Sequence, residues 1–61
     1  MDKAASEALL QALRTHRVEL ETELLEKDLQ LSPEQLGGLS AELRHTHDLI
    51  MIIIRRIRSF R

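Results

Sequence analysis

The side chains of this chain that could bind a metal or a cofactor are three histidines, ten carboxylates and several serines. His45 and His47 are two residues apart, which is about 200° around a helix, so they cannot bind one ion from the same face. His16 is the third histidine, and the chain has no cysteine. We therefore expect no metal site and no cofactor, and we expect these histidines to lie near the surface, opposite glutamates.

The carboxylates are densest between Glu19 and Glu26. General acid–base catalysis needs a cleft that shifts the proton affinity of a carboxyl group, and a pair of helices offers no such cleft. Ser32 and Ser40 have the positions of helix caps rather than of nucleophiles. The sequence therefore predicts that the protein is not an enzyme.

A basic cluster lies near the end of the chain and consists of Arg55, Arg56, Arg58 and Arg61. A basic helix end can bind phosphate groups, so one hypothesis is a homodimeric four-helix bundle that binds RNA or DNA. Alternatively, these arginines complement the helix dipole and keep an apolar neighbouring segment soluble. A net charge of −1 and the absence of Trp and Tyr favour this second interpretation over general binding to polyanions.

Helices must position all of these groups, because Ala, Leu, Glu, Gln and Arg dominate the composition. The one proline and both glycines lie between Pro33 and Gly38. This pattern predicts a helix over about 3–28, a connection over about 29–38, and a second helix over about 39–60. Ser32-Pro33-Glu34-Gln35 is a capping box, so the second helix could instead start at 33 and bend or break at Gly37-Gly38, with Ser40 as a second cap. A connection this short makes the helices antiparallel, and the fold class is an all-α, coiled-coil-like two-helix hairpin.

Both predicted helices carry apolar residues at helical spacing. The stripe of the first helix comprises Leu9, Leu13, Leu20 and Leu24, widened by Val18, Leu25 and Leu29. The seam of the second comprises Leu36, Leu39, Leu43, Thr46, Ile50, Ile53, Ile57 and Phe60. The second set alternates strictly in steps of three and four, so we expect it to pack along the first helix. This arrangement would place Arg55, Arg56 and Arg58 beside Asp2 and Glu7, and the later histidines beside the acidic row.

One segment has more apolar surface than the hairpin can bury. Leu49–Ile54 is six consecutive apolar residues, which cover the whole circumference of a helix, whereas one neighbouring helix covers only one stripe. We therefore expect a partner protein or dimerisation to complete the fold. The predicted partner-binding residues are Leu49, Ile50, Met51, Ile52, Ile53, Ile54 and Ile57. The run is far shorter than the roughly 20 residues of a membrane span, and we expect a cytoplasmic protein.

Several residues after the connection match a known family. These are Pro33, Glu34, Gln35, Glu42, Arg44, Ile50, Ile52 and Ile53, which align without a gap. In them the chain resembles the small co-chaperone of the type III secretion needle subunit, the Ysc/Psc E-type family. The resemblance covers about half of the chain, and Leu36 stands where that family tends to have an aromatic residue. It implies a hairpin that joins a helical-repeat chaperone and holds the aggregation-prone needle subunit before export from a bacterial cytoplasm.

A second resemblance concerns Leu39–Leu43, with the sequence LSAEL. This segment is similar to the Ser-x-Glu-Leu-Asp motif of small sporulation aspartyl-phosphate phosphatases, which are also helical hairpins. Arg44 stands where that family has its acidic residue. The leading hypothesis is therefore the co-chaperone, with the nucleic-acid-binding bundle and the phosphatase-type regulator as alternatives.

Overall fold

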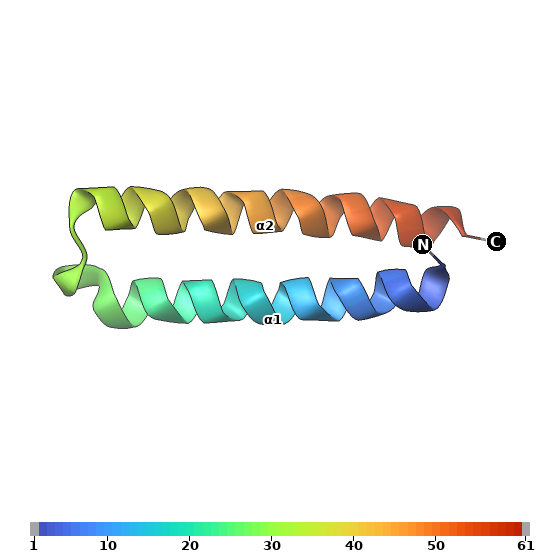
Figure 1. Ribbon diagram of the computed structural model, residues 1–61, viewed down its shortest axis with the longest axis horizontal. Coiled ribbons are helices and arrows are strands. Elements are labelled where there is room, and N and C mark those ends of the chain that lie inside the picture. Colours follow the sequence, from blue (N-terminus) through green and yellow to red (C-terminus); the bar gives the residue numbers. More distant parts are fainter. Residues whose placement is uncertain (1, 61) are drawn as a thin grey trace.

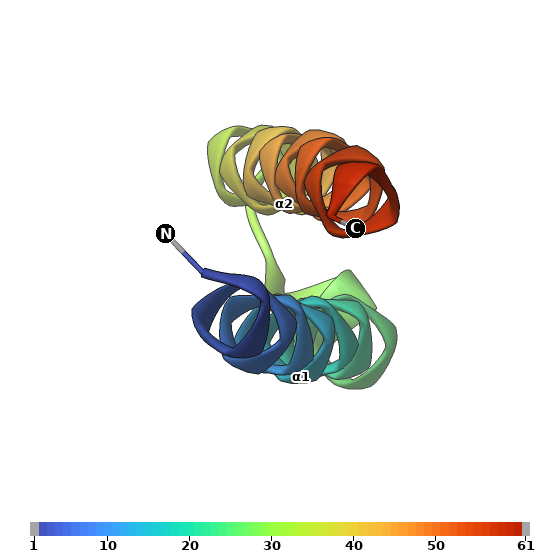
Figure 2. The same cartoon turned by 90° about the vertical axis from the view of Figure 1, so that its right-hand side faces the viewer.

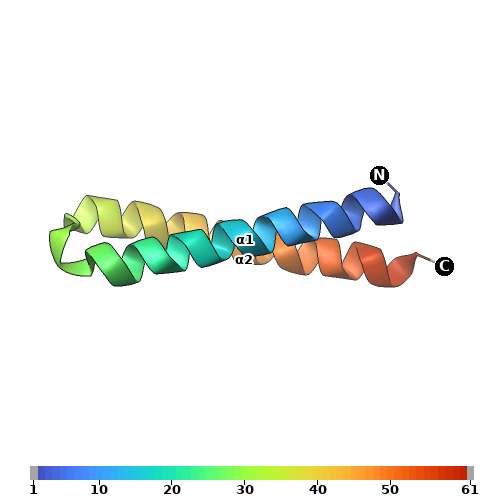
Figure 3. The same cartoon turned by 90° about the horizontal axis from the view of Figure 1, so that it is seen from below.

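The structure, a computed structural model that describes residues 2–60, is a hairpin of two long antiparallel helices (Figure 1). Helix α1 spans Lys3–Lys27, a short 3-10 helix η1 spans Asp28–Gln30, and α2 spans Pro33–Ser59. The molecule extends over 47 × 15 × 13 Å, with both ends of the described chain at one end of the rod and the connection at the other. The end-on view shows a single layer of two helices, and the view from below shows that they cross at a shallow angle (Figures 2 and 3). The predicted all-α antiparallel hairpin is confirmed.

The start of α2 is fixed by the capping box. The Ser32 hydroxyl accepts a hydrogen bond from the Gln35 backbone N–H at 3.2 Å, and the Gln35 side-chain oxygen accepts one from the Ser32 N–H at 2.9 Å. Pro33 occupies the first turn, where its missing N–H costs nothing. Two backbone donors that would otherwise be unsatisfied are thus satisfied. The helix begins at Pro33, which is the earlier of the two starts that the sequence left open.

The two glycines do not interrupt α2. Gly37 and Gly38 both lie inside the helix, and neither has a positive φ. Each glycine costs roughly 1 kcal/mol relative to alanine in a helix interior. The half-buried leucines on either side, Leu36 and Leu39, lie on the face that packs on α1 and offset this cost. Consequently Ser40 lies within the helix and is not a second N-cap, and the connection is shorter than predicted.

The predicted seam of α2 is confirmed, because all eight of its residues are buried or half-buried. The stripe predicted for α1 is only partly correct. Leu20 is buried and the other three leucines are half-buried, but Leu10, which was not in the stripe, is buried as well. The three residues expected to widen it are instead exposed: Val18 by 57%, Leu25 by 83% and Leu29 by 98%. Val18 is two positions from Leu20, about 200° around the helix, so it faces away from α2.

The interior has two apolar parts with the buried polar residue Thr46 between them. Toward the free ends, Leu10, Ile50 and Ile53 form a buried cluster. Leu20 is buried separately, nearer the connection. Thr46 lies between the two parts and is only 3% exposed.

The polar groups in the middle form a short chain of contacts. The Thr46 hydroxyl donates to the Glu42 backbone carbonyl at 2.9 Å. The Glu42 carboxylate lies 3.1 Å from the His16 ring nitrogen Nε2, across the hairpin. We call Thr46, Glu42 and His16 the central polar group. It links the two helices at the boundary between the two apolar parts.

Candidate protein-binding surface

Part of the predicted partner-binding set is buried in the contact between the two helices. Ile50 is 2% exposed and Ile53 is 8% exposed, and both belong to the buried cluster with Leu10. Ile54 and Ile57 are half-buried and pack against that cluster. These four residues already have an apolar neighbour on α1, so most of their surface is not available to another protein while the hairpin is closed.

The remaining members of the set face away from α1 or lie at the edge of the contact. Met51 is 40% exposed and Ile52 is 53% exposed, and Leu49 is half-buried. We call Leu49, Met51 and Ile52 the α2 apolar surface. A helix with its buried stripe on one side is expected to carry polar residues on the other. Large aliphatic side chains here are therefore a departure from the pattern of a self-sufficient hairpin.

The basic cluster continues α2 directly beyond this surface. Arg55, Arg56 and Arg58 are all exposed, and Arg61 lies outside the described residues. None of these three arginines forms an ion pair with any carboxylate in the part of the chain that the structure describes. The antiparallel arrangement places the end of α2 at the same end of the rod as the start of α1, which carries Asp2 and Glu7, but neither carboxylate forms an ion pair with these arginines. The Asp2 carboxylate instead accepts a hydrogen bond from the Ala5 N–H at 2.7 Å, at the start of α1. The end of α2 thus carries three exposed arginines that have no ion-pair partner among the described residues.

The histidines contact the carboxylates differently from the expectation. The histidine that contacts a carboxylate is His16, and its partner is Glu42 on α2. His45 and His47 are exposed on α2. Among residues 2–60, no group of three or more His, Asp or Glu side chains is arranged to hold a metal ion.

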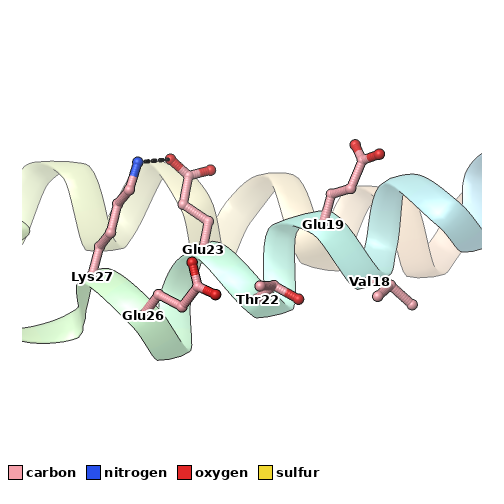
Figure 4. Close-up of a pocket in the computed structure, with 6 residues that line it drawn as sticks. All are labelled: Val18, Glu19, Thr22, Glu23, Glu26 and Lys27. Atoms are coloured by element: carbon pink, nitrogen blue, oxygen red, sulfur yellow. Dashed lines mark ion pairs between the residues drawn. The ribbon is translucent and has the colours of Figure 1, made fainter.

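A shallow groove open to solvent runs along α1 (Figure 4). Its lining residues are Val18, Glu19, Thr22, Glu23, Glu26 and Lys27. Lys27 lies 3.6 Å from Glu23, and the close-up shows this pair at one end of the groove. All the lining residues come from one helix, so the groove has no opposite wall to enclose a substrate.

The sequence pattern predicted exposed apolar residues on α2, but it did not reveal a second exposed apolar set on α1 and η1. Val18, Leu25 and Leu29 are the three most exposed large hydrophobic residues of the described chain. Their positions differ by seven and four, which is helical spacing, but that spacing was assigned to the buried stripe. The spacing of Leu10, Leu13, Leu20 and Leu24 could have identified the true buried face.

Comparison with known proteins finds no protein-family model, curated protein or solved structure that matches this chain. In the described part of the chain, neither helix contains an apolar stretch with the length and hydropathy of a membrane span.

Proposed function

We propose that this hairpin is a protein-binding module whose α2 apolar surface packs into a groove of a partner. The observation that carries the proposal is the exposure of Met51 and Ile52, at 40% and 53%, on the side of α2 that α1 does not cover. Burying a large aliphatic side chain is worth about 1.5–3 kcal/mol. An amphipathic helix offered to an apolar groove is a recurrent form of protein recognition.

The more specific proposal is a co-chaperone that joins a helical-repeat chaperone and holds a type III secretion needle subunit before export. Its support is the sequence resemblance described above, together with the short turn at Pro33 and the long α2. In this role, Ile52 and Met51 fill the groove of the chaperone, while Ile50 and Ile53 hold α2 against α1. The packing against α1 thereby holds α2 in position, with its apolar surface directed toward the chaperone.

The test is co-expression with a helical-repeat chaperone and a needle subunit encoded beside this chain, followed by measurement of the mass of the purified complex. Ile52→Glu is expected to abolish the complex, because it places a charge in a desolvated groove. Since Ile52 is exposed in the free hairpin, helix content measured by circular dichroism should stay unchanged.

The matched control is Leu25→Glu, which places the same charge on an exposed aliphatic residue of α1. This variant is expected to form the complex as the wild type does. If Ile52→Glu also binds like the wild type, the α2 apolar surface is not the binding site. If neither protein joins a complex of defined mass with the wild type, the co-chaperone role is wrong.

A second candidate rests on the three arginines that have no ion pair within the described residues. A homodimer of this hairpin would bind RNA or DNA through Arg55, Arg56 and Arg58. Each phosphate contact makes the affinity fall with rising salt, so binding of a short RNA duplex should weaken steeply between low and physiological salt. Replacement of all three arginines with glutamine should remove that binding, and wild-type protein that ignores the duplex at low salt would eliminate this candidate.

A further inference from the structure

The hairpin has two exposed apolar surfaces that carry opposite charges. The first, on α1, consists of Val18, Glu19, Thr22, Leu25 and Glu26, and we call it the acidic face. The second, on α2, consists of Met51, Ile52, Arg55 and Arg56, and we call it the basic face. Every one of these nine side chains is exposed.

The acidic face combines aliphatic side chains with free carboxylates. Val18, Thr22 and Leu25 follow one another in steps of four and three, so they lie along one side of α1. Leu25 is 83% exposed and Val18 is 57% exposed. Glu19 and Glu26 line the groove beside them and form no ion pair with any described residue (Figure 4).

The basic face also combines apolar side chains with charged ones, but its charges are positive. Met51 and Arg55 are four residues apart, as are Ile52 and Arg56, so each aliphatic side chain has an arginine on the next turn. Neither arginine has an ion-pair partner within residues 2–60. An apolar centre beside unpaired positive charge is the complement of the acidic face.

The two faces cannot meet within one molecule. The acidic face lies on the half of α1 nearer the connection, whereas the basic face lies on the half of α2 nearer the free ends (Figure 1). Both also point away from the contact between the helices, since the buried residues Leu20 and Ile50 lie on the opposite sides. Contact between these faces therefore requires two copies of the chain.

We propose that the basic face of one copy docks on the acidic face of a second copy. Met51 and Ile52 then cover Val18 and Leu25 on α1, and Arg55 and Arg56 lie beside Glu19 and Glu26. Because the two contacting surfaces differ, each pair leaves one acidic face and one basic face free, and association continues head to tail. This inference does not depend on the proposed function, although a partner that binds Ile52 would compete with self-association.

The contact is small and relies on exposed charges, so it belongs to the class of readily reversible associations. Two consequences can be measured in sedimentation velocity experiments on the full chain. The average mass should rise past that of a dimer as the concentration increases from about 10 µM to about 1 mM. Raising the salt should shift the association to higher concentration, because surface ion pairs are screened.

Two single variants test which faces touch. Leu25→Asn disables only the acidic face and Ile52→Asn disables only the basic face, and each should weaken self-association about 10-fold or more. Helix content should remain that of the wild type, since both side chains are exposed. An equimolar mixture of the two variants retains one acidic and one basic face, so it should form a dimer that does not extend further.

The result with Leu25→Asn alone decides between this arrangement and a symmetric dimer. If this variant still self-associates as the wild type does, the acidic face is not part of the contact and the proposal is wrong. Wild-type protein that remains monomeric at all concentrations and at low salt would also overturn it. Neither result affects the proposed function, because Leu25 variants are expected to bind the chaperone normally.

Discussion

Replacing Gly37 and Gly38 with alanine should stabilise the protein considerably. Both glycines lie within α2, neither has a positive φ, and an added Cβ at either position has no atom within 4 Å. Each substitution therefore gains helix propensity without a steric cost, about 0.8–1 kcal/mol per residue. The double variant should gain about 1.5–2 kcal/mol in free energy of unfolding, which for a chain this small raises Tm by about 6–16 °C.

The assay is thermal and urea unfolding followed by circular dichroism, under conditions in which the protein has one defined mass. Ala41→Gly is the matched control, because Ala41 is exposed on the same helix and the change runs in the opposite direction. It should cost about 1 kcal/mol. The dependence of the unfolding free energy on urea should stay constant in both variants, since the packed surface is unchanged.

One result would refute this reasoning. If the double variant is no more stable than the wild type, or is less helical, while Ala41→Gly behaves as expected, then α2 is not continuous at Gly37-Gly38 in solution. The glycines would then be needed for a turn, and the second helix would begin near Ser40.

Two serines give further predictions of opposite sign. The Ser6 hydroxyl is fully buried and has no hydrogen-bond partner among the described residues, so Ser6→Ala should raise the unfolding free energy by about 1–3 kcal/mol. Exposed Ser40→Ala reports the propensity gain alone, and an equal effect at both positions would show that Ser6 is solvated. Ser32→Ala removes the capping hydroxyl and should cost about 1 kcal/mol in urea unfolding, whereas an unchanged midpoint would contradict the importance of the capping box.

Much of the fold followed from local signals in the sequence. The capping box from Ser32 to Gln35 needs only four adjacent residues, so it was visible without any knowledge of the tertiary structure. The seam of α2 comprises eight residues in alternating steps of three and four, and a pattern of that length defines one face of a helix. The antiparallel arrangement then followed from the short connection.

The buried face of α1 was harder to predict because one of its buried residues is polar and several apolar residues of the same segment are exposed. Ser6 is the most buried residue of the helix and is polar, and Leu9 and Leu10 are adjacent, so either of them could have been assigned to the stripe. Leu25 and Leu29 were assigned inward because leucine is usually buried, and no local signal opposes that assignment. Within Leu49–Ile54 the seam predicted that Ile50 and Ile53 are buried, but it did not predict how far α1 covers Leu49 and Ile54, which are half-buried.

The central polar group has a consequence for the alignment of the two helices. Apolar seams with a heptad repeat allow one helix to slide along the other by a whole heptad, about 10 Å, and to pack nearly as well. After such a slip, Thr46 would lie opposite a different layer of α1, and His16 would lose its contact with Glu42. Buried polar residues that pair across an apolar seam can select one alignment, but here only Thr46 is buried, and its hydroxyl bonds within its own helix. The short connection therefore sets the register of the hairpin, and the exposed contact between His16 and Glu42, halfway along its length, adds only a small preference for the same register.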